Sequence, residues 1–187
     1  MKYFKKIIGE RIYLSPRTIE DAEVYTEWLN DFSVTDYTGR SGETMTQEAE
    51  KDYLEKRIEK QATFAIIDLK EDKLIGGIDL NKIHSVNRTA ELGIFIGVKE
   101  YRGKGYGTEA INLILDYGFN YLNLNNINLH LMEFNERALN CYKKCGFKEC
   151  GRRRKSEFIN GKYYDVIEMD MLAEEFTGSY IKNKEII

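Results

Sequence analysis

A glycine-rich segment at residues 101–108, Y-R-G-K-G-Y-G-T, constrains this 187-residue chain more than any other feature. It follows a mostly apolar segment at 90–98 and precedes residues 107–121, whose apolar side chains recur at helical spacing. Glycines in such a strand–loop–helix unit let the backbone approach a ligand and turn several amides the same way. Together with the positive end of the helix, these amides suit a phosphate or pyrophosphate. Arg102 and Lys104 are expected to add mobile positive charge at the mouth of the loop.

The sequence of this loop can be compared with two nucleotide-binding motifs. A P-loop needs a glycine, four residues and then Gly-Lys-Ser/Thr, but here Gly105 follows Lys104 and Val98 stands where the first glycine belongs. The dinucleotide fingerprint G-x-G-x-x-A does match residues 105–110, and Glu133 ends the next expected strand, where an acid would bind a ribose. Too little chain follows to complete a doubly wound sheet, so a Rossmann-type domain stays the alternative.

The patterns along the chain predict one α+β domain at residues 8–172 and a C-terminal tail at 173–187. Helices are expected over 18–29, 47–60, 107–121 and 135–145, and the polar segment 30–42 is expected to be a loop. Strands are expected over 11–15, 63–68, 73–83, 90–98, 127–132, 148–158 and 163–171, with Asn160-Gly161 as the turn of the last hairpin. The low polarity of 90–98 indicates a strand buried on both faces.

Composition argues against several classes of protein. The 28 Lys and Arg against 31 Asp and Glu give a net charge of −3, which does not suit a nucleic-acid binder. No apolar run approaches the ~20 residues of a membrane span, and the N-terminus lacks the apolar core of a signal peptide. Cys141, Cys145 and Cys150 are odd in number and lack partners at ligand spacing. We therefore expect no disulfide framework, no metal, no membrane partner and a cytoplasmic protein.

Two motifs resemble those of the GCN5-related N-acetyltransferases. Residues 102–107 resemble the family's Q/R-x-x-G-x-G/A signature, and residues 135–147 resemble its N-x-x-A-x-x-x-Y-x-x-x-G-F block, in the family's order and spacing. Residues 90–93 and 158–167 are similar to the branch that holds the ribosomal-protein alanine and spermidine acetyltransferases. The resemblance implies a twisted mixed sheet of about seven strands flanked by about four helices. It also implies acetyl transfer from acetyl-CoA directly to a primary amine, with a CoA-binding regulator without turnover as a further alternative.

The resemblance further implies how acetyl-CoA binds. Its pyrophosphate would lie on the amides of the glycine-rich loop, and its pantetheine arm would lie where the strands at 90–98 and 127–132 splay apart. A backbone amide near residues 94–96 would polarise the thioester carbonyl. The implied cofactor-binding residues are Ile94, Ile96, Val98, Arg102, Gly103, Lys104, Gly105, Tyr106, Gly107, Thr108, Asn135, Ala138 and Tyr142.

Three side chains are candidates for acid–base catalysis. Tyr142 lies four residues after Ala138 on an apolar helix face and is the candidate acid for the departing thiolate, with a core aromatic as the alternative. Glu91 and His130, each in an apolar strand, are the candidate bases. A salt bridge from Glu91 to Arg88 and a core histidine are the alternatives. If both side chains face the same way, they could act together through water.

The acceptor stays open at this stage, with protein N-termini, polyamines, amino sugars and other small amines as alternatives. The acidic segment 47–60 is interpreted as a solvated face rather than the wall of a cation site. Asn135 is also expected to cap its helix. A homodimer is compatible with this sequence.

Overall fold

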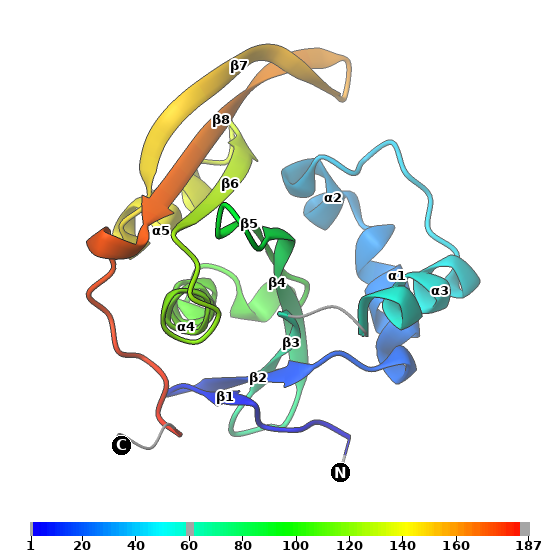
Figure 1. The fold of residues 1–187 in the computed structure, drawn as a ribbon. Helices are drawn as coiled ribbons and strands as arrows, with labels where there is room; N and C mark the ends of the chain where they lie inside the picture. The colour runs from blue at the N-terminus through cyan, green and yellow to red at the C-terminus, as the bar shows by residue number, and fades with distance from the viewer. Residues whose placement is uncertain (1, 59–61, 184–187) are drawn as a thin grey trace.

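A computed structural model describes residues 2–58 and 62–183 and shows one eight-stranded sheet in the order β1-β2-β3-β4-β5-β6-β8-β7 (Figure 1). Every neighbouring pair is antiparallel except β5 and β6, which run parallel. A doubly wound sheet is therefore excluded. The strands are β1 (Ile7–Ile8), β2 (Ile12–Pro16), β3 (Thr63–Asp68), β4 (Leu74–His84), β5 (Thr89–Ile96), β6 (Asn126–Met132), β7 (Lys148–Ile159) and β8 (Lys162–Leu172).

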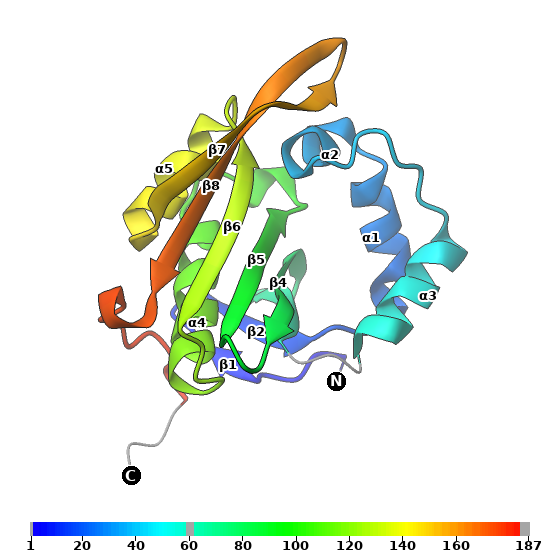
Figure 2. The ribbon, with the colours of Figure 1, turned by 45° about the horizontal axis from the view of Figure 1, so that its top comes forward.

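The described residues form five α-helices, in two layers on opposite sides of the sheet. Figure 2 shows the first three on one side and the last two on the other. The helices are α1 (Ala22–Leu29), α2 (Phe32–Thr38), α3 (Gln47–Ile58), α4 (Tyr106–Asn120) and α5 (Glu136–Cys145). The predicted α+β class is confirmed. The expected end of α3 at residues 59–60 lies outside the described residues.

The prediction of a loop over residues 30–42 was wrong, because α2 lies within it. Asp31 caps this helix, since its carboxylate accepts the Ser33 amide at 2.8 Å. Gly39 ends it in the left-handed region at φ 71°. The ring of Tyr37 packs edge-to-face on Phe134, which anchors α2 beside the end of β6.

Two apolar clusters hold the layers together. The larger lies between the sheet and α4–α5 and includes Ile78 and Ile114, both inaccessible to solvent. The smaller lies under α1 and α3 and includes Tyr13, Ile67 and Leu54. The sheet is therefore sandwiched, and the surfaces that face α1–α3 and α4–α5 have separate environments.

A buried ion pair underlies the α1 side of the sheet. The Arg17 guanidinium lies 2.9 Å from the Asp79 carboxylate, and the two side chains are only 4% and 12% exposed. Arg17 also donates to the Phe64 carbonyl at 3.2 Å and stacks on the ring of Tyr25. A Cβ on Gly77 would lie 2.5 Å from the guanidinium, so glycine is required there.

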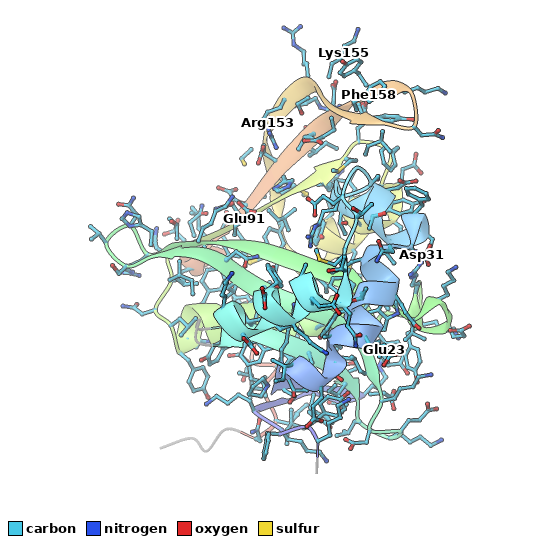
Figure 3. All side chains as sticks on the ribbon, turned by 90° about the vertical axis from the view of Figure 1, so that its right-hand side faces the viewer. Glu23, Asp31, Glu91, Arg153, Lys155 and Phe158 are labelled. Carbon is cyan, nitrogen blue, oxygen red and sulfur yellow. The ribbon has the colours of Figure 1, made fainter. Side chains whose placement is uncertain are left out.

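The β7–β8 hairpin ends in the expected Asn160-Gly161 turn, both residues having positive φ. It extends beyond the other strands and carries Arg153, Lys155 and Phe158 (Figure 3). The tail after β8 returns to α4, where the Asp116 carboxylate accepts the amides of residues 180 and 181 at 2.6 and 3.0 Å. Within the described ranges, no helix combines the length and apolarity needed to cross a bilayer.

Candidate active site

The sheet opens between β5 and β6, the two parallel neighbours. Their register begins at Thr89 and Asn126 and ends at Glu91 and Asn128, although both strands continue beyond it. Figure 2 shows the two arrows diverging after this point. The parallel start and later splay implied by the family resemblance are therefore confirmed.

The splay exposes one edge of β5. Ile94 and Ile96 pair with β4 on their other side and are only half-buried, as is Val98 just after the strand. The prediction that 90–98 is buried on both faces was therefore wrong, because only Ala90, Leu92 and Gly97 in this segment are buried. Strand separation, which the apolar sequence does not encode, leaves backbone groups of β5 facing an opening.

The glycine-rich loop after β5 has the conformation that an anion site requires. Gly103 and Gly105 have φ of 72° and 85°, in the left-handed region that favours glycine. In the part of the chain that the structure describes, the amides of residues 103–105 donate no hydrogen bond to a backbone carbonyl. Those of residues 106–108 form the first turn of α4, where no intrahelical acceptor exists. This cradle fits a diphosphate such as that of acetyl-CoA.

Arg102 is held rather than mobile, which corrects the expectation for its side chain. Its guanidinium donates to the Ile96 and Gly97 carbonyls at 2.8 and 2.7 Å and to the Ser33 carbonyl at 3.2 Å. The side chain thereby joins the loop to the end of β5 and to α2. Lys104 is exposed, as expected of a charge at the mouth of the loop.

Arg11, which the sequence analysis did not single out, fixes the other side of the loop. It donates to the Lys104 carbonyl at 3.0 Å and to the Glu109 carboxylate at 2.9 Å, and its guanidinium stacks on Tyr106. A Cβ on Gly105 would lie 3.2 Å from Arg11. No local motif in the sequence indicates this contact, because about a hundred residues separate its partners.

Helix α5 carries the second motif and follows the end of β6, where the Asn135 amide donates to the Met132 carbonyl at 2.9 Å. The Asn135 side chain caps the helix by accepting the Ala138 amide at 3.2 Å, as expected. Tyr142 is 8% exposed and packs edge-to-face on Phe147 within the core cluster against which the half-buried Ile94 also packs. Burial raises the pKa of the Tyr142 phenol far above its ordinary value, so the phenol is protonated at neutral pH.

Glu91 and His130 face each other on the side of the sheet that α1–α3 cover. The Glu91 Oε1 lies 3.9 Å from the His130 Nδ1, and the Lys82 ammonium lies 2.8 Å from Oε2. The alternative pairing of Glu91 with Arg88 is not formed, since Arg88 donates to the Asn123 carbonyl. His130 is exposed rather than a core histidine. Glu91 therefore lies at the last parallel residue pair, and His130 lies two residues further along β6.

Comparison with known proteins identifies the family. Residues 11–148 match the acetyltransferase (GNAT) domain. The chain belongs to this family. A spermidine N(1)-acetyltransferase of Vibrio cholerae is 39% identical over 111 residues, which span 59% of this chain and 64% of that enzyme. An uncharacterized N-acetyltransferase of Bacillus licheniformis is 32% identical over 90% of this chain and 97% of its own length.

Solved structures agree with this assignment. The structure of the Vibrio cholerae spermidine N-acetyltransferase in complex with CoA and spermine superimposes with a TM-score of 0.82 and 31% identity, covering 88% of this chain and 97% of that one. The GNAT protein described here is thus an N-acetyltransferase that transfers an acetyl group to an amine, as the motif resemblance predicted.

The dinucleotide-binding alternative is not favoured for this GNAT enzyme. Glu133, the expected ribose-binding acid, instead accepts the Asp165 amide at 2.9 Å and pairs with Arg152 at 3.2 Å. Its carboxylate therefore holds the β7–β8 hairpin against the end of β6. Lys82 and α2, which no motif in the sequence indicated, lie beside Glu91 and β5.

Proposed function

We propose that this enzyme acetylates a primary amine of a small polycation, with spermidine and spermine as the reference acceptors. The observation that carries the proposal is the Glu91 carboxylate at the end of the β5–β6 parallel register. It already holds one ammonium, that of Lys82, at 2.8 Å, and that side chain is 76% exposed. An exposed lysine can be displaced, and a cationic acceptor can then take its position.

The helices that cover this face of the sheet are acidic. Residues 19–56 contain eleven Asp and Glu against three Lys and Arg, whereas the whole chain has a net charge of only −3. Such a surplus raises the local concentration of cations and accelerates their encounter with the site. It disfavours acceptors that carry phosphate or several carboxylates.

The amides of the glycine-rich loop are available to bind acetyl-CoA. Those of residues 103–108 would bind the pyrophosphate, and the main chain of Arg102 and Lys104 would form the rest of the loop around it. Ile94, Ile96 and Val98 would bind the pantetheine arm through their backbone groups, as a strand would. Asn135 and Ala138 would line the same opening from α5. One amide near 94–96 would stabilise negative charge on the thioester oxygen.

Two proton transfers are proposed, one on each side of the sheet. Glu91 and His130 would take a proton from the acceptor ammonium, directly or through one water, because a protonated alkylamine near pKa 10 cannot attack. Tyr142, which is protonated at neutral pH, would supply a proton to the departing CoA thiolate. Amine and thiolate thereby exchange protons with separate groups.

An acceptor screen tests this proposal. Release of the CoA thiol is measured with spermidine, spermine, a peptide with N-terminal alanine, and glucosamine 6-phosphate. We expect kcat/KM to be highest for the polyamines and lower by about tenfold or more in Glu91→Gln. Preference for the peptide or for the phosphorylated sugar would contradict the polycation proposal while leaving N-acetyl transfer intact.

A regulator without turnover and a dinucleotide-binding domain give different results in the same experiments. The regulator would be stabilised thermally by acetyl-CoA but would release no thiol with any amine. The dinucleotide domain would be stabilised by NAD in preference to CoA. Each outcome would contradict the proposed reaction.

We also propose that the protein acts in the cytoplasm and self-associates. β7 is an edge strand, and Phe158 and Tyr163 on its hairpin are 62% and 63% exposed with their rings in contact. Unpaired edges and exposed aromatic pairs favour association. Light scattering on the purified chain is expected to give a dimer or larger assembly, and a monomer at all concentrations would contradict this.

A further inference from the structure

The Arg102 guanidinium lies between the end of β5 and helix α2. Its Nε donates to the Ile96 carbonyl at 2.8 Å, and its Nη2 donates to the Gly97 carbonyl at 2.7 Å. Its Nη1 donates to the carbonyl and to the hydroxyl oxygen of Ser33, each at 3.2 Å. All three nitrogens of the planar group are therefore engaged, two of them on β5 and one on α2.

Two further contacts attach the corner between α1 and α2 to the segment between β5 and α4. A Cβ on Gly97 would lie 2.1 Å from the Trp28 indole, so this ring packs directly on the Gly97 backbone. The Lys99 ammonium lies 3.4 Å from the carboxylate of Asp31, which caps α2. This lysine is 66% exposed, so its ion pair contributes little. Arg102 is half-buried and is therefore the main polar contact between α2 and the glycine-rich loop.

The same corner borders the face of β5 on which the acceptor is proposed to bind. Glu91 and Phe95 are four residues apart on β5, so their side chains lie on one face of the sheet. Trp28 of α1 packs edge-to-face on Phe95, with ring centroids 5.8 Å apart. Tyr37 of α2 packs in the same way on Phe134, beside the end of β6. The position of α1 and α2 relative to β5 therefore shapes one wall of the proposed acceptor site.

We propose that Arg102 is a positioning residue that couples the binding of acetyl-CoA to the binding of the acceptor. The inference rests on the proposed function, which places the pyrophosphate on the amides of residues 103–108 and the acceptor at Glu91. Bound pyrophosphate orders the loop that begins at Arg102, and the ordered loop holds the guanidinium on Ser33. The acceptor then meets a wall that is already in position, so its binding loses less conformational entropy.

The loop has the freedom that such coupling requires. Gly103 and Gly105 follow Arg102 directly, and glycine loses more conformational freedom on ordering than any other residue. Among the described residues, no backbone carbonyl accepts the amides of residues 103–105, so a bound anion supplies acceptors that the protein itself does not. Binding of the pyrophosphate therefore changes the order of the segment from which the Arg102 side chain extends.

The planar guanidinium distinguishes a bridge from a simple positive charge. Lysine carries the same charge as a single flexible ammonium, which cannot donate to two carbonyls on β5 and to Ser33 at the same time. Arg102→Lys therefore keeps the charge beside the pyrophosphate and removes the bridge. Arg102→Gln removes both. If the bridge carries the coupling, the two variants should behave alike.

Titration calorimetry on the full-length protein tests the proposal. The Kd of spermidine is measured alone and with saturating CoA, and the Kd of CoA is measured alone and with saturating spermidine. In the wild type, each molecule is expected to tighten the binding of the other by about tenfold, because such coupling is reciprocal. In Arg102→Lys and Arg102→Gln, both factors should fall below about twofold. Arg40→Gln, which removes a guanidinium paired with Glu43, is the matched control and should keep the wild-type factors.

Binding of CoA alone shows that each variant is folded, so a lost coupling factor is not read from an unfolded chain. Coupling factors near one in the wild type would overturn the inference. Wild-type factors in Arg102→Lys would assign the effect to charge and would overturn the bridge, and equal losses in Arg40→Gln would do the same. If the wild type binds CoA and an N-terminal peptide but not spermidine, the polycation proposal fails instead. The same titrations with that peptide would then decide the role of Arg102.

Discussion

Glu91 on β5 and His130 on β6 come together at 3.9 Å where the two parallel strands begin to separate. Each comes from an otherwise apolar strand, and each points toward the acidic helical layer rather than toward α4. Pairing across the splay gives a carboxylate and an imidazole that can share one water molecule. The two groups are therefore best tested as a unit.

Glu91→Gln and His130→Ala are each expected to lower kcat by about 100-fold at pH 7. The double variant should be no slower than the worse single variant if both residues act on one water. An unchanged kcat in both single variants would leave bulk solvent as the proton acceptor.

Lys82→Ala is expected to lower the KM for spermidine, because the Glu91 carboxylate then has no competing ammonium at 2.8 Å. The KM for acetyl-CoA should not change. Lys82→Arg is the matched control, since it preserves the positive charge. Both variants should keep their stability within about 1 kcal/mol, because the Lys82 side chain is 76% exposed. A KM for spermidine that rises in Lys82→Ala would show that the ammonium assists binding instead.

Tyr142→Phe is expected to lower kcat by about 100-fold with little change in the KM for acetyl-CoA. A proton donor fails when the pH exceeds its pKa, and burial raises the pKa of Tyr142 above its ordinary value. Wild-type kcat should therefore show no loss attributable to this phenol below about pH 10. Tyr121→Phe, at a 53% exposed tyrosine, is the control. Full turnover of Tyr142→Phe at every pH would refute its role as the acid.

The glycine-rich loop, the capped helix after Asn135 and the Asn160-Gly161 hairpin could all be predicted, because local residues determine each of them. Their requirements are positive φ, a side-chain cap or a tight turn, and these requirements select particular residue types. The α+β class followed from the order of such segments. The first two of these elements are the ones proposed to bind acetyl-CoA.

Helix α2 could not be predicted from propensity, since its seven residues, F-S-V-T-D-Y-T, are weak helix formers. It forms because Asp31 and Gly39 cap it and because Tyr37 packs on Phe134, a contact between distant residues. The same limitation applies to Lys82 and Arg11, whose partners are fixed by sheet register and helix packing. Much of the proposed acceptor side, and the Arg11 contact with the glycine-rich loop, therefore depend on tertiary contacts that the sequence pattern does not show.

Asp79→Ala is expected to destabilise the protein by about 3–5 kcal/mol, because it leaves the Arg17 guanidinium buried without its carboxylate. The double variant Arg17→Met/Asp79→Leu should recover most of this loss, since it removes both charges. Urea unfolding measures the free energies. Glu43→Ala, which breaks the more exposed pair with Arg40, is the control and should cost less than about 1 kcal/mol. Equal losses in Asp79→Ala and Glu43→Ala would contradict a stabilising role for the buried pair.

Comparison of Gly105→Val with Gly161→Val distinguishes the effect of backbone strain from the effect of losing the anion-binding amides. Both glycines have positive φ, 85° and 78°, so each substitution should cost about 1–2 kcal/mol of stability. A Cβ at Gly161 meets no atom within 4 Å, whereas one at Gly105 meets Arg11 at 3.2 Å. Gly105→Val should therefore raise the KM for acetyl-CoA and leave the ranking of acceptors unchanged, while Gly161→Val should leave this KM at the wild-type value. Equal effects of the two variants on acetyl-CoA binding would show that strain alone acts, and the amides of the loop would then lose their proposed role.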